Sequence, residues 1–230
     1  MRKTKVTLVS VYREENVRFL EKLISQILRE DDIRLSVYLH YMGNNLQSLC
    51  TPIAKYTESA FTPVDRMHIL RTLTKKGIHS DYIILADDDV IIADGKLHKC
   101  LMDFTNHHIF LGQPAHHDRS YCNYPALKTS NIDISYINSP EIGPLLVVKS
   151  EYFSFFFPDW IKHQGFGLEF FWNHLRTKYN LKYAVHSGCT IQHMQETNSI
   201  VHETDKYQLE NLQELFDSEQ DIVTRIQSGD

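Results

Sequence analysis

The sequence lacks several features that would assign it to a broad class of protein. It has no apolar stretch near the roughly 20 residues that a membrane-spanning helix requires. Its formal net charge of -5 over 230 residues argues against the basic surface of a nucleic-acid-binding protein. It contains no internal repeat, no low-complexity tract and no Gly/Ser-rich linker. With 42% hydrophobic and 23% charged residues, this composition is ordinary for an enzyme with one substantial core.

Paired cysteine motifs are also absent. The four cysteines form no CxxC pair and are widely scattered, at Cys50, Cys100, Cys122 and Cys189. We expect reduced, mostly buried thiols in a cytoplasmic protein. The 13 histidines include two doublets, His107-His108 and His116-His117, which suggest either a metal cluster or surface and substrate-facing side chains. The second interpretation is favoured, because the rings of adjacent residues point in different directions.

Hydrophobic periodicity in the first half predicts alternating strands and helices. The N-terminus is basic, but its apolar run is short, so residues 6–11 predict a strand and not a signal peptide. A helical stripe follows at 19–28, a second strand at 33–43 and a second helix within 62–80. Residues 81–86, DYIILA, form a third strand that is continuous in hydrophobicity and therefore buried on both faces. This order predicts an α/β fold with a mostly parallel central sheet flanked by helices.

The second half is less regular. Residues 108–137 predict a strand, a polar loop and a return, and residues 142–157 an apolar strand followed by a short helix. A glycine-lined turn leads into a helix within 165–180, and a last strand covers 182–194. The tail, residues 201–230, has an apolar stripe at helical spacing. This stripe packs either on the body of the protein or on a partner, such as a second copy of the chain.

Three adjacent carboxylates, Asp87, Asp88 and Asp89, follow the third strand directly. Ligands of open α/β sheets bind at the carboxyl ends of the strands. Like charges about 4 Å apart repel by roughly 1 kcal/mol in water and about 4 kcal/mol at an effective dielectric of 20. A bound cation would offset this repulsion, so the cluster predicts a cation site. Mg²⁺ or Mn²⁺ suits such oxygen ligands, and alternation along the chain gives Asp87 and Asp89 a common face. The alternative is that these residues form Asx turns or cap a helix.

A strand that ends in a D-x-D pair resembles the nucleotide-sugar glycosyltransferases of the GT-A fold. Three further blocks occur in the order of a largely uncharacterised family of predicted glycosyltransferases: LGQPAHH, EIGPLLVVKSEYF and QGFGLEFFW. The blocks are similar to that family's Gln-Pro-Ala segment and its Gly-Trp-Gly-Leu-Asp turn. The resemblance covers roughly residues 5–195. It implies a single GT-A-like, Rossmann-like catalytic domain over residues 1–200.

The resemblance also implies a metal site and a catalytic base. Asp87 and Asp89 would hold Mn²⁺ or Mg²⁺ against the donor diphosphate, and His193, in TIQHM, occupies the place of a third metal ligand. A histidine there is otherwise a satisfied core or surface residue. Glu169 would take the proton of the acceptor hydroxyl, unless it only complements the helix dipole. The chain departs from the family turn at Phe166, where Trp is frequent, and at Glu169, where Asp is frequent. Phe170 stands where many inverting GT-A enzymes have the second acid of a Glu-Asp pair, which leaves the base and the stereochemical class open.

The resemblance also predicts which further residues contact the substrates. Contacts to the nucleotide, ribose or diphosphate are predicted for Val11, Tyr12, Arg13, Arg66 and Asp88. Contacts to the acceptor are predicted for Gln113, His116 and Trp172. The alternatives are an ordinary polar loop after the first strand, a solvated helix face at Arg66 and core packing of Trp172.

The combined prediction is a metal-dependent glycosyltransferase of the hexosyltransferase type. It would use a nucleoside-diphosphate sugar, expected to be a UDP-sugar, and a glycan or other hydroxyl acceptor. We expect it in the cytoplasm or peripherally at the inner membrane face, with polysaccharide biosynthesis as its setting. The alternatives are a non-catalytic glycan- or nucleotide-binding module, a sugar nucleotidyltransferase, which normally carries a glycine-rich loop absent from VSVYREEN, and a phosphohydrolase, whose nucleophile pattern is absent.

Overall fold

The computed structural model of this chain describes residues 2–42, 57–60, 79–122, 124–158 and 167–195. Nine strands within these ranges form one sheet: β1 (Thr4–Tyr12), β2 (Ile33–Tyr41), β3 (Thr57–Ala60), β4 (Tyr82–Ala86), β5 (Val90–Gly95), β6 (Leu111–His116), β7 (Ile134–Tyr136), β8 (Leu145–Lys149) and β9 (Tyr183–His193). The α-helices in these ranges are α1 (Val17–Leu28), α3 (Leu97–Asn106), α4 (Phe153–Phe156) and α5 (Leu168–Tyr179). Short 3₁₀ turns are η1 (Glu14–Asn16), η4 (Pro125–Leu127) and η5 (Ser150–Tyr152).

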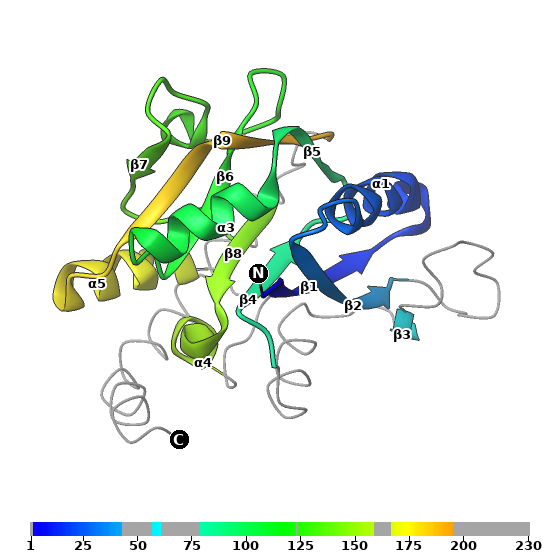
Figure 1. Cartoon of the computed structure of the whole chain (residues 1–230), viewed down its shortest axis with the longest axis horizontal. Helices are drawn as coiled ribbons and strands as arrows, with labels where there is room; N and C mark the ends of the chain where they lie inside the picture. The colour runs from blue at the N-terminus through cyan, green and yellow to red at the C-terminus, as the bar shows by residue number, and fades with distance from the viewer. Residues whose placement is uncertain (1, 43–56, 61–78, 123, 159–166, 196–230) are drawn as a thin grey trace.

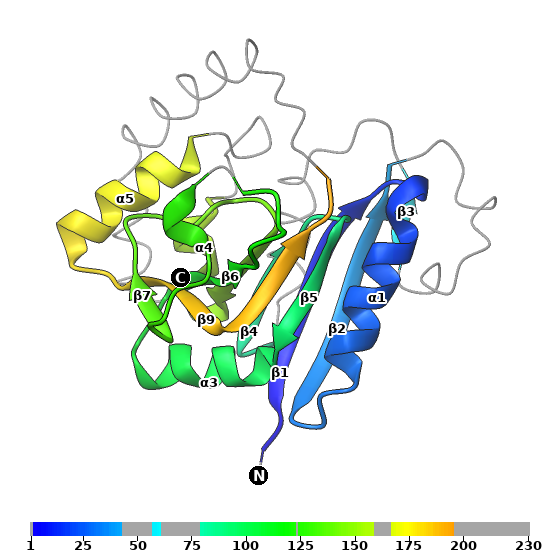
Figure 2. The ribbon, with the colours of Figure 1, turned by 90° about the horizontal axis from the view of Figure 1, so that it is seen from above.

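The sheet has the order β3-β2-β1-β4-β8-β6-β9-β5, with β7 paired to β9. β1, β2, β3 and β4 are parallel, as are β6 and β9, whereas β8, β5 and β7 run antiparallel to their neighbours. The α/β prediction is confirmed, and the sheet is mixed. β1, β4, β6 and β9 nevertheless end at one common edge, where Figure 2 shows the arrowheads of β1 and β9.

Helices cover both faces of the sheet, and each face has its own core. Alternation along β4 places Ile84 in one core and Ile83 and Leu85 in the other. The first core packs α1 and α3 on the sheet, and the second packs α4 and α5 (Figure 1). All five residues of β4 are buried, as their continuous hydrophobicity predicts. Each buried Ile or Leu side chain of β4 contributes roughly 1.5–3 kcal/mol by burial.

Two polar side chains at the end of α1 fix the edge strand β5 and the start of α3. The Gln26 amide pairs with the N–H and the C=O of Ile92, at 3.1 and 2.7 Å. The Glu30 carboxylate accepts hydrogen bonds from the N–H groups of Leu97 and His98 in the first turn of α3, at 2.9 and 2.8 Å. Carboxylates at a helix N-terminus satisfy free N–H groups and the helix dipole. Gln26 and Glu30 therefore hold β5 and the start of α3 beside α1.

Several predictions fall outside the described residues. They are the helix within 62–80, which lies largely in the range 61–78, the contact assigned to Arg66 and the tail over 201–230. Within the described part, the structure contains no helix with the length and hydrophobicity needed to cross a membrane.

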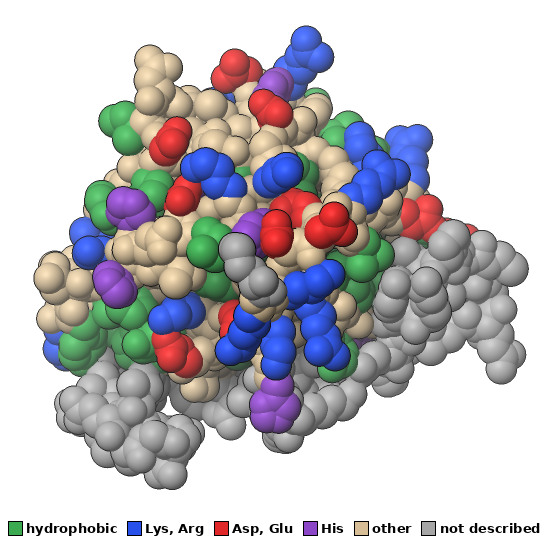
Figure 3. All heavy atoms as spheres, viewed as in Figure 1, with side chains coloured by type: hydrophobic (Ala, Val, Ile, Leu, Met, Phe, Trp, Pro, Cys, Tyr) green, Lys and Arg blue, Asp and Glu red, His purple; other side chains and the backbone are tan. Residues whose placement is uncertain are grey.

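The edge where β1 begins carries a surface hollow that is separate from the acidic cluster. Figure 3 faces this edge and shows Lys and Arg side chains gathered around the N-terminal end of β1. The hollow is lined by Arg2, Lys3, Thr4, Ser80, Asp81, Tyr82, Thr105, Lys149 and Glu151. None of the predicted site residues belongs to it.

Candidate functional site

The predicted metal ligands meet at the carboxyl edge of the sheet. Asp87, Asp88 and Asp89 form the link from β4 to β5, and β5 pairs with β9 and not with β4. Val90, the first residue of β5, is paired with His193, the last residue of β9. This register places the acidic turn beside the end of β9, 104 residues further along the chain. Two strands therefore fix the ligands from both sides.

Asp87, Asp89 and His193 each offer one ligand atom, and these atoms lie within 4.8 Å of one another. His193 Nε2 is 3.0 Å from Asp89 Oδ1. Adjacent ligands of an octahedral ion with bonds of about 2.1 Å are separated by about 3 Å. The grouping expected from the alternation of the three aspartates is present. Two carboxylates and one imidazole form a donor set that fits Mn²⁺.

Surrounding hydrogen bonds orient this group. Asp89 Oδ2 accepts a hydrogen bond from the N–H of Gln195 at 3.1 Å, and its C=O accepts one from the N–H of Met194 at 2.9 Å. The N–H of His193 donates to Ser120 Oγ at 2.9 Å. Asp87 N–H donates to the Pro144 C=O at 3.0 Å. Such supporting contacts hold ligands in place before a metal binds.

The charge of the acidic turn acts on His193, whose side chain is largely buried. Burial lowers the pKa of His193, but the hydrogen bond and charge of Asp89, with Asp87 and Glu141, outweigh burial and raise it. Each of these carboxylates favours a positive charge at this position. A divalent cation held here would be favoured by the same field.

Asp88 points to the other side, as the alternation predicts. Its Oδ2 accepts a hydrogen bond from the Arg13 N–H at 2.8 Å, and its Oδ1 accepts one from Asn16 Nδ2 at 3.0 Å. Asn16 Oδ1 accepts in turn from Gln195 Nε2 at 2.8 Å. Burial raises the pKa of Asp88, partly offset by these donors. Asp88 thus joins the loop after β1 to the segment after β9.

Glu169 lies in the first turn of α5, two residues after Gly167, which has a φ of 93°. This left-handed conformation favours glycine. Glu169 Oε1 accepts a hydrogen bond from the N–H of Ile142 at 3.2 Å. Burial and the charges of Glu169 and Glu141 raise the pKa of Tyr124, which places both carboxylates near this phenol. Glu169 therefore faces the segment before β8, which also contacts Asp87.

The predicted substrate-contacting residues divide into two groups. Gln113 and His116, on β6, are buried beside Glu141. Gln113 Oε1 accepts a hydrogen bond from the Glu141 N–H at 2.7 Å, and His116 Nε2 lies 3.5 Å from Glu141 Oε2. The Arg13 side chain is 49% exposed at the carboxyl edge. Val11 is partly buried in the sheet.

Tyr12 and Trp172 are not brought to the site surface. The Tyr12 side chain is fully buried, with its ring centroid 5.4 Å from that of Tyr41. Trp172 is fully buried in the core formed with α4, and its indole N–H donates to the Phe156 C=O at 2.9 Å. This placement fits the core-packing alternative for Trp172.

The sequence interpretation assigned no role to several residues that the structure places at the site: Asn16, Ser120, Cys122, Glu141 and Gln195. Gln195 follows His193 by two positions, and Glu141 opens one of the family-like blocks, which were the available signals. Asn16, the last residue of η1, and Ser120, in the loop after β6, belong to polar segments without a distinguishing pattern.

Comparisons with known proteins confirm the predicted GT-A-like fold. Neither the family models nor the curated protein sequences give a match. The structure is similar to GalNAc-T7 with UDP, GalNAc and Mn²⁺, with a TM-score of 0.57, 11% identity, and coverage of 85% of this chain and 45% of that one. It is also similar to S. aureus TarS, with a TM-score of 0.56, 9% identity and coverage of 81% and 36%. For TarS 1–349 in complex with UDP-GlcNAc, the TM-score is 0.56, the identity 11% and the coverage 93% and 73%.

Proposed function

We propose that this chain is a metal-dependent glycosyltransferase. It transfers a hexose-type sugar from a nucleoside-diphosphate sugar to a hydroxyl group of a glycan or another acceptor. The observation that carries the proposal is the convergence of Asp87, Asp89 and His193 within 4.8 Å at the carboxyl edge of a GT-A-like sheet. Fold alone does not define an activity, so the donor set is the decisive feature.

The donor set specifies the kind of ion. Asp87, Asp89 and His193 would hold Mn²⁺ or Mg²⁺, and the imidazole favours Mn²⁺. When bound, the ion would supply Lewis-acid assistance by neutralising the departing diphosphate. The similar structures contain UDP with Mn²⁺ in GalNAc-T7 and UDP-GlcNAc in TarS, which supports a UDP-sugar as donor.

The other residues position the reactants. Arg13 is exposed next to the acidic turn, within 3.7 Å of Asp88, where its guanidinium can meet a nucleotide. The acceptor oxygen bonds to the anomeric carbon while the bond from that carbon to the diphosphate oxygen breaks. The acceptor proton would pass to the carboxylate of Glu169, whose Oε1 accepts the Ile142 N–H at 3.2 Å.

The first test measures thermal unfolding of the full chain with a panel of nucleoside diphosphates, with and without Mn²⁺. A ligand that binds only the folded state raises the melting temperature. We expect a Mn²⁺-dependent rise with UDP that is lost in Asp89→Asn. Asp94→Asn is the matched control, because Asp94 is exposed on β5 and the hydrogen bond that its Oδ1 accepts from the Gly95 N–H survives in the amide.

Product formation separates a transferase from a binding module. Incubation with UDP-sugars, Mn²⁺ and an acceptor library should release UDP and a glycosylated product, detected by mass spectrometry. Nucleotide binding without product across the library would favour the binding module. No shift with any nucleotide, in folded wild-type protein, would contradict the proposal and leave the aspartates structural.

A further inference from the structure

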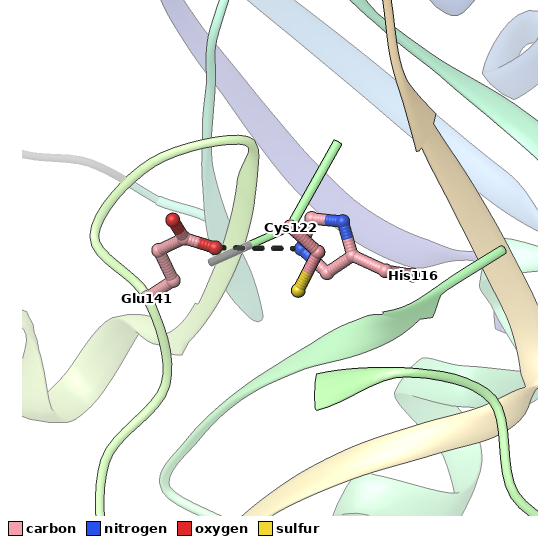
Figure 4. Close-up of side chains that lie close together, drawn as sticks. All are labelled: His116, Cys122 and Glu141. Carbon is pink, nitrogen blue, oxygen red and sulfur yellow. Dashed lines mark ion pairs between the residues drawn. The ribbon is translucent and has the colours of Figure 1, made fainter. Parts of the chain in front are cut away.

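A second group of ligand-type side chains lies beside the first and is not used by the proposed reaction. It consists of His116 at the end of β6, Cys122 in the loop that follows and Glu141 ahead of β8. Each offers one ligand atom, and these atoms lie within 4.8 Å of one another. Figure 4 shows the three side chains pointing toward one another from three separate segments.

The hydrogen bonds of Ser120 fit a tautomer of His116 with the proton on Nδ1. Ser120 Oγ donates its one hydrogen to the Tyr121 C=O at 3.2 Å and accepts from the His193 N–H at 2.9 Å. With the hydroxyl hydrogen placed in this way, the contact with His116 Nδ1 at 2.8 Å is donated by Nδ1–H. In this tautomer the lone pair of His116 is on Nε2.

That lone pair faces a carboxylate. His116 Nε2 lies 3.5 Å from Glu141 Oε2, and both atoms are buried without a hydrogen-bond partner in the described part of the chain. The His116 side chain is fully buried. Two buried acceptors in this arrangement are unfavourable unless a positive species lies between them. The nearby Cys122 sulfur makes a metal ion a better fit than a proton, because it supplies a third ligand.

We propose that His116 Nε2, Cys122 Sγ and the Glu141 carboxylate bind a Zn²⁺-type cation. Zn²⁺ takes nitrogen, sulfur and oxygen ligands at roughly 2.0–2.3 Å, so two ligands of a tetrahedral ion lie roughly 3.3–3.7 Å apart. The separation of 3.5 Å between His116 and Glu141 matches this spacing. A thiol and an imidazole select a softer ion than the neighbouring aspartates do, so the two sites differ in metal preference.

The thiol must lose its proton to act as a ligand. Burial raises the pKa of Cys122, and the charge of Glu141 raises it further. A bound cation reverses both effects, so binding releases a proton and tightens as pH rises. The hydrogen bond from His116 Nδ1–H to Ser120 Oγ is of the kind that orients a metal-binding imidazole.

The position of Glu141 gives the ion a structural role. The next residue, Ile142, donates its N–H to Glu169, and Pro144 accepts from the Asp87 N–H. A Cβ added at Gly143 would lie 3.2 Å from Asp87 Oδ2. A cation on Glu141 would therefore fix the segment that contacts both the candidate base and the acidic turn. The inference needs only metal binding and does not depend on the proposed transferase activity.

The test uses the full chain, stripped with a chelator and titrated with Co²⁺ and Zn²⁺. We expect one equivalent of Co²⁺ to give a thiolate-to-metal absorption band in the near ultraviolet, displaced by Zn²⁺. Cys122→Ser should abolish the band, and His116→Ala should weaken Zn²⁺ binding by at least roughly tenfold in competition with a chromogenic chelator. Cys100→Ala and His117→Ala are the matched controls and should leave both readouts unchanged.

Asp89→Asn distinguishes the two sites, because it should keep the thiolate band. A band that survives in Cys122→Ser, or that is lost in Asp89→Asn with Cys122 intact, would overturn the proposal. Failure of the folded wild type to bind Zn²⁺ would assign His116 and Glu141 to a proton-shared pair and also overturn it. Should Cys122→Ser not fold, X-ray absorption of Zn²⁺-loaded wild type decides: one sulfur among nitrogen and oxygen ligands is expected, and none contradicts the site.

Discussion

His193 and Asp89 contact each other through Nε2 and Oδ1 at 3.0 Å, across a pairing of β5 with β9. Asp89 directly precedes β5 and His193 is the last residue of β9, so the pairing of the two strands brings these side chains together. Asp87 completes the group from the same turn. The geometry is therefore a property of the backbone and is available to a cation before any substrate binds.

Replacing His193 by Ala should lower Mn²⁺ affinity by at least roughly tenfold, and should lower Mg²⁺ affinity less. The reason is that the imidazole is the ligand that distinguishes the two ions. Titration calorimetry with both ions measures the ratio, with His117→Ala as control. An unchanged ratio of the two affinities would show that His193 is a packing residue.

Glu169→Gln should reduce kcat by roughly 100- to 10,000-fold, because the amide cannot accept the acceptor proton. The amide oxygen can still accept the Ile142 N–H, so the fold and the Mn²⁺-dependent UDP shift should persist. UDP release in the product assay measures the rate, with Glu151→Gln as a surface control. Full activity with a lowered melting temperature would instead assign Glu169 to the helix dipole.

Asp88→Asn should destabilise the fold by roughly 1–3 kcal/mol while leaving Mn²⁺ affinity unchanged. One of the two donors, the Arg13 N–H or Asn16 Nδ2, would face an amide N–H in place of an acceptor. Asn16 cannot simply turn its amide, because its oxygen accepts from Gln195. Urea unfolding measures the effect. Unchanged stability with a raised KM for the donor would restore the ribose contact predicted from the sequence.

Asp103→Asn should remove roughly 1–2 kcal/mol of stability near neutral pH. Burial alone would raise the pKa of Asp103, but hydrogen bonds from Lys99 and His186 lower it below 3.8 in the folded state. Its stabilisation is thus present above the unfolded pKa and is lost as pH falls through the folded pKa. The unfolding free energies of the wild type and of Asp103→Asn should therefore converge as the pH falls below about 4. Asp133→Asn, 75% exposed, should behave as wild type, and a difference that persists at low pH would contradict this origin.

The sequence predicts the fold where hydrophobic periodicity is strong. The unbroken run of β4 and the stripe of α1 become buried elements at the expected positions. The sequence pattern does not predict β5 as a strand of its own, because only Val90, Ile91 and Ile92 are buried and the rest of the strand is exposed. Its pairing with β9 is long-range, and no local pattern encodes it.

The same contrast between local patterns and long-range contacts applies to the candidate site. Alternation within the turn assigns Asp87 and Asp89 to one direction and Asp88 to the other, because that depends on adjacent residues only. The approach of Glu141 and Cys122 to His116 depends on the paths of two loops and carries no spacing signal. The burial of Trp172 results from α4 packing on α5, which was visible in the sequence only as one of two alternatives.

The separation of 104 residues between Asp89 and His193 also has a consequence for the folding of the chain. Contacts between distant residues form late, after the entropy of closing the intervening loop has been overcome. β9 pairs with β5, β6 and β7, so its docking completes one half of the sheet and the metal ligands in a single event. Under the proposed function, Mn²⁺ would have no complete site on a partly folded chain and would stabilise only molecules in which β9 has docked.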